Sequence, residues 1–212
     1  MTISAVDFPD AARRAVLAGI AMRARSRGFW TPKLKQANPD RLRLCAPHRV
    51  AMLPLNRMRQ AMPRPDASGK PAPASLRSLA QVLGWRFLIL NDRDEAIAAA
   101  HSYLTEDGHY RLSDLNEGPF VASTLTALQK PLVLEAMSRK SGENPFAEVL
   151  LLFAPAICFA GVWARFEQEP PDFILPLDPS HLPTFAEVTP EQLVLVLSKA
   201  SMAVRIDSHS GG

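Results

Sequence analysis

The sequence predicts an α+β fold: an antiparallel sheet of about five strands with helices packed on it, preceded by a basic, helical and irregular N-terminal arm. After residue 75, strand-like runs occur in consecutive groups, without the strict strand–helix alternation of a parallel sheet. The 19 prolines, about 9% of the 212 residues against an average of about 5%, favour short elements over a long helical bundle.

Charge is divided unevenly along the chain. Residues 1–75 carry a formal charge of +10 and the remainder −7, within a net charge of only +3. Such a division indicates two regions with different roles, or one region that folds onto the other. We expect a basic helical arm over residues 1–61, a proline-rich linker over 62–74, an α+β domain over 75–205 and a disordered tail over 206–212.

The arm should begin with a helix that Asp7 caps and Gly28 ends. Residues 29–47 are rich in proline and are expected to be irregular, with a candidate short strand over 41–45. Pro54 should start a second, short helix. Apolar residues recur at helical spacing in the first helix: Ala12, Val16 and Ile20.

In the body, Ser75 is expected to cap a helix that ends at Gly84, and residues 86–90 to form a strand. Residues 95–104 allow either a helix or a strand, because alanines favour the former and alternation favours the latter. The turn residues at 105–108 favour a hairpin, so we predict a three-stranded meander that ends near residue 115.

Further along, helices are predicted from Pro119 to Gln129 and over 131–140, followed by core strands over 146–153 and 156–166. Residues 173–177 contain a proline and would form an edge strand. The final helix should begin at Thr189, which forms a capping box with Gln192.

The two cysteines are too few for a disulfide framework. We expect reduced thiols, with Cys158 buried in the apolar run around it; one disulfide between Cys45 and Cys158 is the alternative. Residues 15–22 are flanked by charges unlike those of a signal peptide, and residues 149–164 are too short to cross a bilayer and contain Pro155. The prediction is a soluble protein of a bacterial-type cytoplasm without a transmembrane segment.

Motifs for metals and cofactors are incomplete. Cys45 and His48 have the spacing of half a zinc site, but no second pair follows at the required distance. Neither glycine-rich phosphate-binding pattern occurs, and no G-x-S-x-G sequence marks a nucleophile. We therefore expect no metal and no cofactor.

An acid–base pair is the alternative catalytic interpretation. His101 and His109 would face each other across the predicted hairpin, with Glu117 shortly after, and could serve a small hydrolase or lyase. Histidines on a partly exposed sheet face are more often simply solvated or hydrogen-bonded, so this interpretation ranks second.

The basic arm supplies the candidate partner-binding residues. Its cations and interleaved aromatic residues could follow the phosphates of a nucleic acid. They are spread thinly, however, and no nucleic-acid-binding module is visible, so packing of the arm on the acidic body explains the charge more simply. The candidate residues are Arg13, Arg14, Phe29, Trp30, Arg57 and Arg59.

The predicted order after residue 75 is helix, three strands, helix, two strands, helix. Over residues 75–202 this order is similar to that of type III secretion chaperones, although no motif is shared. The resemblance implies a small acidic dimer that wraps unfolded segments of other proteins, but a fold does not determine function. We expect a non-enzymatic binding protein whose partner is another protein or a second copy of itself. A hydrolase or lyase, and nucleic-acid association through residues 1–75, are the alternatives.

Overall fold

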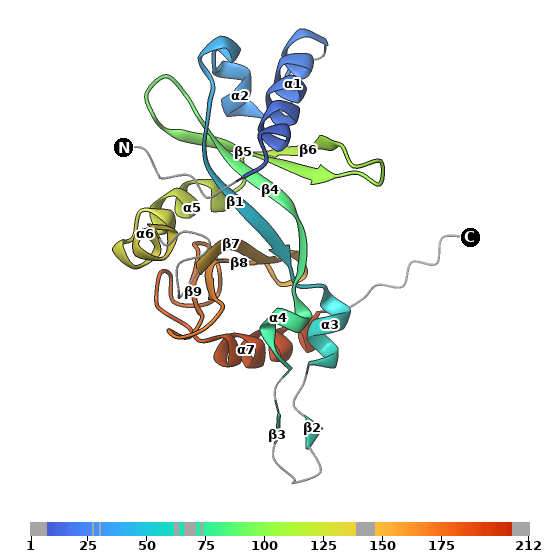
Figure 1. Cartoon of the computed structure of the whole chain (residues 1–212), viewed down its shortest axis with the longest axis vertical. Coiled ribbons are helices and arrows are strands. Elements are labelled where there is room, and N and C mark those ends of the chain that lie inside the picture. The colour runs from blue at the N-terminus through green and yellow to red at the C-terminus, as the bar shows by residue number, and fades with distance from the viewer. Residues whose placement is uncertain are drawn as a thin grey trace, which may run out of the picture.

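The computed structural model describes residues 8–26, 28–29, 31–61, 64–65, 71–72, 74–138 and 147–204. Asp7, Trp30 and the predicted tail at 206–212 lie outside these ranges. Within the predicted linker, the structure describes a two-stranded ribbon of β2 (Arg64–Pro65) and β3 (Pro71–Ala72) (Figure 1).

A seven-stranded mixed sheet organises the described part of the chain, in the order β6-β5-β4-β1-β7-β8-β9. All neighbouring strands are antiparallel except β1 and β7, which run parallel. The α+β class is confirmed. The predicted number of about five strands was too low, and the sheet is mixed rather than antiparallel because β1 and β7 are parallel. The strands are β1 (Arg43–Met52), β4 (Gln81–Leu90), β5 (Ala96–Leu104), β6 (Tyr110–Asn116), β7 (Ala147–Ala154), β8 (Phe159–Phe166) and β9 (Phe173–Pro176).

Strand β1 lies at the centre of the sheet although its residues belong to the basic N-terminal segment. The sequence predicted only a short strand over 41–45, because Pro47 cannot donate a ladder hydrogen bond. In the structure the pairing with β4 is interrupted between Cys45 and His48, and Ala46 has a φ of 47°. This bulge accommodates Pro47, so the strand continues to Met52.

The helix predicted from Ser75 to Gly84 forms only in its first half, and its second half is strand. Helix α4 (Leu76–Leu79) ends after four residues, and Ala80 is already extended with φ −74° and ψ 137°. Residues 81–84 pair with β1 and extend β4. The apolar spacing of Leu76, Leu79 and Leu83 suits a helix locally, but pairing with the central strand overrides it.

Two groups of helices cover different halves of one face of the sheet (Figure 1). Helices α1 (Asp10–Ser26) and α2 (Pro32–Gln36) pack on the half that contains β4, β5 and β6. Helices α3 (Leu55–Gln60), α4 and α7 (Pro190–Ala203) pack on the half that contains β7, β8 and β9. Short 3-10 turns, η1 (Pro39–Arg41) and η2 (Pro155–Ile157), connect elements.

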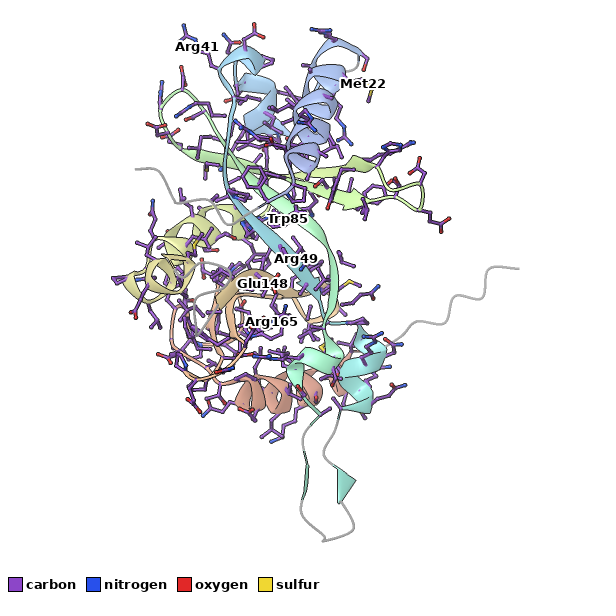
Figure 2. All side chains as sticks on the ribbon, viewed as in Figure 1. Met22, Arg41, Arg49, Trp85, Glu148 and Arg165 are labelled. Carbon is purple, nitrogen blue, oxygen red and sulfur yellow. The ribbon has the colours of Figure 1, made fainter. Side chains whose placement is uncertain are left out.

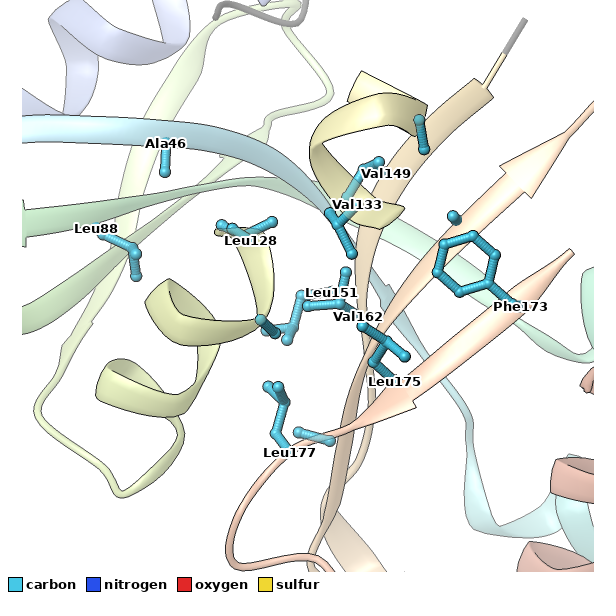
Figure 3. Packing of buried hydrophobic residues seen from close by; sticks show 14 of the residues in the cluster. Ala46, Leu88, Leu128, Val133, Val149, Leu151, Val162, Phe173, Leu175 and Leu177 are labelled. Atoms are coloured by element: carbon cyan, nitrogen blue, oxygen red, sulfur yellow. The ribbon is translucent and has the colours of Figure 1, made fainter. Parts of the chain in front are cut away.

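The other face is covered by α5 (Phe120–Leu128) and α6 (Pro131–Ser138). Figure 3 shows the resulting core, in which Leu128 and Val133 of these helices meet Leu151 of β7 and Val162 of β8. Because Leu151 alternates with Leu150 and Leu152, which belong to the opposite cluster, the centre of the sheet is buried on both faces there.

Several local predictions are confirmed. The meander β4-β5-β6 forms, β9 lies at an edge of the sheet, and α7 begins with the capping box of Thr189 and Gln192. Cys158, expected in the core, is instead exposed in the turn between η2 and β8, and both cysteines are free. In the part of the chain that the structure describes, no helix has both the length and the apolar character required to cross a bilayer.

Candidate functional site

Four ionisable side chains form a row across the sheet. His48 of β1 lies opposite Arg86 of β4, Arg86 opposite His101 of β5, and His101 opposite Asp114 of β6. Residues directly opposite on neighbouring strands point to the same face. This face is the one that α5 covers, because Arg86 donates a hydrogen bond of 2.9 Å to the Thr124 hydroxyl of α5. We call these four residues the cross-strand row.

Arg86 is a cation inside the protein, with only 3% of its surface exposed. Burial lowers the pKa of Arg86 to about 10, an effect that the Asp114 carboxylate opposes, so the guanidinium remains protonated near neutral pH. Its Nη1 is paired with Thr124, but its Nε has no hydrogen-bond partner among the described residues. Buried cations usually have a direct carboxylate partner.

His48 lies beside Arg86 and is 1% exposed. Its Nδ1 lies 2.6 Å from the carbonyl oxygen of Ala46, which can only accept, so Nδ1 carries the proton. Burial and then the Arg86 charge lower the pKa of His48 to about 3, and the ring is therefore neutral at physiological pH. Its Nε2 is left as an unprotonated acceptor without a partner in the described chain.

His101 and Asp114 form the outer end of the row. Nδ1 of His101 lies 3.2 Å from Oδ2 of Asp114, and the side chains are 25% and 48% exposed. The hydrogen bond from His101 is the main cause that holds the pKa of Asp114 below its ordinary value. Nε2 of His101 is enclosed and makes no hydrogen bond to a described residue. The row thus changes from a buried guanidinium to a partly exposed carboxylate.

A groove of about 300 Å³ opens beside the outer end of the row. Gly84 belongs to its lining, where this residue lies between Val50 of β1 and Tyr103 of β5. A Cβ atom at this position would lie 2.1 Å from the carbonyl oxygen of Ser102. Only glycine allows the two strands to approach this closely.

The groove has two chemically different walls. Val50 and Phe153 form an apolar wall, whereas Asp114 and Asn116 contribute polar groups next to the ring of His101. Such a mixture of apolar surface and a few polar groups is typical of binding sites. Trp85, Leu83, Tyr103, Ser102 and Ser113 complete the lining.

Exposed apolar side chains gather at two strand ends beside the groove. Val82 and Leu83 at the start of β4 are 37% and 39% exposed, and Tyr103 and Leu104 at the end of β5 are 41% and 55% exposed. The two strand ends are hydrogen-bonded neighbours, since Gly84 pairs with Tyr103. Leu83 and Tyr103, which we call the apolar rim, also line the groove, and exposed apolar side chains of this kind mark interaction sites. Leu104 follows Tyr103 directly in β5 and therefore points to the opposite face of the sheet.

The structure separates the three residues of the predicted acid–base set. His101 faces Asp114 and not His109, because the turn after β5 pairs Leu104 with Tyr110 and places His109 at the exposed end of the hairpin. Glu117 precedes α5 in the chain, and its carboxylate contacts the first turn of α2. There it accepts hydrogen bonds from the backbone N–H groups of Lys33 (2.9 Å) and Leu34 (2.6 Å).

The candidate partner-binding residues of the arm have different positions. Arg13 and Arg14 are exposed on α1, but Phe29 is buried in the core beneath α1. Arg57 and Arg59 bind backbone carbonyls: Arg57 that of Leu79, at 3.4 Å, and Arg59 those of Ser201 and Val204. These two arginines therefore connect α3 to α4 and to the C-terminal end of α7.

Basic residues of the N-terminal segment pair with acidic residues of the rest of the chain. Arg41 lies 3.7 Å from Asp92, and Arg43 pairs with Asp94. Arg49 of β1 lies 3.1 Å from Glu148 of β7, whose other oxygen is bound by Arg165 of β8. Figure 2 shows Arg49, Glu148 and Arg165 close together near the middle of the molecule.

Sequence reasoning missed most of the site. Arg86 gave one usable signal, because it is the single charged residue in the apolar run 85–90. The importance of Gly84 and Asp114 depends on which strands pair and in which register, and no local pattern contains that information.

The fold and the groove define an α+β protein with a mixed sheet and an amphipathic groove on one sheet face. Among the described residues, no three His, Cys, Asp or Glu side chains gather so that they could hold a metal ion. In comparisons with known proteins, no protein family, curated protein or solved structure shows a significant match to the chain.

Proposed function

We propose that this protein is a non-enzymatic binding protein that holds a segment of a partner polypeptide in the groove above Gly84. The observation that carries the proposal is the position of the apolar rim around an amphipathic groove. A partner would bury Leu83 and Tyr103 while one of its own side chains occupies the groove beside Val50 and Phe153. Burial of apolar area of this kind drives most protein association.

The dimensions favour a polypeptide over a small molecule. The groove volume of about 300 Å³ lies at the lower limit for small-ligand sites, and Leu83 and Tyr103 leave exposed apolar surface at its rim.

The polar groups of the groove support binding more than catalysis. A general base must reach the proton that it removes. In His101, Nδ1 is engaged with Asp114 and Nε2 is enclosed, so neither nitrogen faces a ligand. The Ser102 hydroxyl is likewise buried.

The test is a selection of peptides on the intact protein from a displayed random library, followed by affinity measurement with labelled synthetic peptides. We expect the selected peptides to lose at least tenfold in affinity for Tyr103→Ser and for Leu83→Ser. Met22→Ser is the matched control, because Met22 is 64% exposed on α1 and lies outside the groove lining. Equal affinity for all three variants, or failure to select any peptide while a known peptide-binding domain yields ligands, would overturn the proposal.

A second candidate function is nucleic-acid association through residues 1–75. It is favoured by Arg13, Arg14 and Arg25, which are exposed on α1 and form no ion pair with a described residue. Phosphate contacts make affinity strongly dependent on salt. Binding of labelled single- and double-stranded oligonucleotides should weaken at least tenfold between 50 and 200 mM salt. Absence of binding at the lower salt concentration would eliminate this candidate.

A further inference from the structure

The groove above Gly84 contains one exposed carboxylate, and this group indicates what the partner segment carries. Nearly half of the Asp114 side chain is exposed, and His101 holds its pKa below the ordinary value. Asp114 is therefore a carboxylate at any pH near neutrality. The other polar groups of the lining are His101, whose Nδ1 is bound to this carboxylate, the amide of Asn116 and the hydroxyls of Ser102, Ser113 and Tyr103.

The nearest cations do not neutralise this charge for a ligand. Arg86 is 97% shielded and is separated from Asp114 by His101 in the cross-strand row. Arg111 lies opposite Tyr103 on β6, but it is not part of the groove lining, and its Nη2 lies 3.9 Å from Asp107 in the hairpin turn. A ligand in the groove therefore meets a carboxylate with no Lys or Arg beside it among the lining residues that the structure describes.

The spacing between Gly84 and the carboxylate suits a peptide. Gly84 and Asp114 lie on strands β4 and β6, which are separated by β5. Neighbouring strands are about 4.8 Å apart, and Asp114 is level with Arg86, two residues along β4 from Gly84, so the two positions are roughly 12 Å apart. Side chains of residues i and i+2 on an extended segment point in the same direction about 7 Å apart, and a Lys or Arg side chain covers the remaining distance.

We propose that the partner segment is extended and carries an apolar side chain over Gly84 and, about two residues away, a Lys or Arg that pairs with Asp114. This inference rests on the proposed function and names the chemistry of the segment. The apolar side chain supplies most of the affinity, and the basic side chain determines orientation and selectivity.

The test uses synthetic octapeptides with a central Leu and one variable residue, Lys, Arg, Gln or Glu, placed one, two or three positions away. We expect the Lys and Arg peptides with a spacing of two to bind at least fivefold tighter than the Gln peptide, and the Glu peptide to bind most weakly. The advantage of Lys over Gln should disappear in Asp114→Asn and persist in Asp114→Glu. Asp107→Asn is the matched control, because Asp107 is a carboxylate of the same hairpin outside the groove lining.

The outcomes separate this inference from the proposed function. The inferred Lys or Arg would be wrong if binding requires Leu but does not distinguish Lys from Gln. It would also be wrong if the preference for Lys survives in Asp114→Asn. In both cases the groove remains a peptide-binding site. No Leu-dependent binding of any peptide overturns both. A circular dichroism melt of each variant shows that the comparison is made between folded proteins.

Discussion

Gly84 and Ser102 approach each other so closely that a Cβ atom on residue 84 would lie 2.1 Å from the Ser102 carbonyl oxygen. The absence of a side chain at residue 84 is what permits this approach, and a comparison with a glycine that has no such neighbour measures how much the contact contributes to stability.

Gly84→Ala should lower the free energy of unfolding by about 2 to 4 kcal/mol, because the contacted atom is backbone and the strands must separate. Gly108→Ala is the control: Gly108 has a φ of 79° in the hairpin turn, but nothing lies within 4 Å of its added Cβ. Gly108→Ala should lower the free energy of unfolding by about 1 kcal/mol, because alanine disfavours the positive φ of this residue. Urea unfolding of both variants measures the two losses of unfolding free energy. Equal losses would show that the close approach to Ser102 does not add to the cost of a side chain at residue 84.

Thr124→Val should be destabilising because it leaves an N–H group of the buried Arg86 without an acceptor. The expected loss is about 1 to 3 kcal/mol in the free energy of unfolding. In an Arg86→Met background the same substitution should cost less than about 1 kcal/mol, since no cation remains to be satisfied.

Thr126→Val provides the matched control for this cycle. Thr126 donates to the Ala122 carbonyl one turn earlier, as Thr124 does to that of Phe120, but it is exposed and has no arginine partner. Its effect should be the same in both backgrounds. If the cost of Thr124→Val does not depend on residue 86, the hydrogen bond between them contributes nothing measurable.

Stability should depend on pH through His48. Its pKa falls from an ordinary 6.5 to about 3 on folding, so below pH 6.5 the unfolded chain binds a proton that the folded protein does not. The free energy of unfolding is therefore unaffected by His48 above this pH and decreases as the pH falls from 6.5 toward 3, by up to about 1.4 kcal/mol per pH unit. Asp114, whose pKa is also lowered, adds a loss in the same direction at lower pH.

Urea unfolding at pH 7, 6, 5 and 4 tests this dependence. His48→Asn should flatten the change between pH 6 and 5, and His109→Asn, in the exposed end of the hairpin, should not. An unchanged slope in His48→Asn would mean that His48 is not the group responsible.

Glu148→Gln should cost about 1 to 3 kcal/mol of unfolding free energy, because it leaves Arg49 and Arg165 without their common carboxylate. The Glu148 side chain is 12% exposed, whereas both arginines are partly solvated, which limits the effect. Asp92→Asn breaks the exposed pair with Arg41 and should cost less than about 1 kcal/mol. Equal costs in thermal or urea unfolding would contradict the buried role of Glu148.

What could be predicted from the sequence was local. The capping box at Thr189 and Gln192 and the turn at 105–108 each lie within a few residues, and both form as expected. The full length of strand β1 could not be predicted, since a proline interrupts it and its partners lie in distant parts of the chain. The cross-strand row was missed for the same reason. His48, Arg86, His101 and Asp114 become neighbours only after four strands have paired in one register.

The structure explains part of the uneven distribution of charge along the sequence. Arg41, Arg43 and Arg49 pair with carboxylates from later in the chain, as expected if the basic segment folds onto the acidic one. The exposed pairs stabilise the fold little, so their main effect is to reduce local repulsion. Arg13 and Arg14 remain exposed on α1 and are available for other contacts.

The parallel pairing of β1 with β7 has a consequence for biosynthesis. Arg49 of β1 aligns with Leu150 of β7, about one hundred residues later. A growing chain therefore exposes β1, β4, β5 and β6 well before the ribosome has made the strand that covers the other side of β1. During this interval the nascent protein carries an unpaired edge in what becomes the middle of its sheet, and such edges recruit strands from other chains. We expect the emerging polypeptide to need protection from aggregation until residues 147–154 have left the exit tunnel.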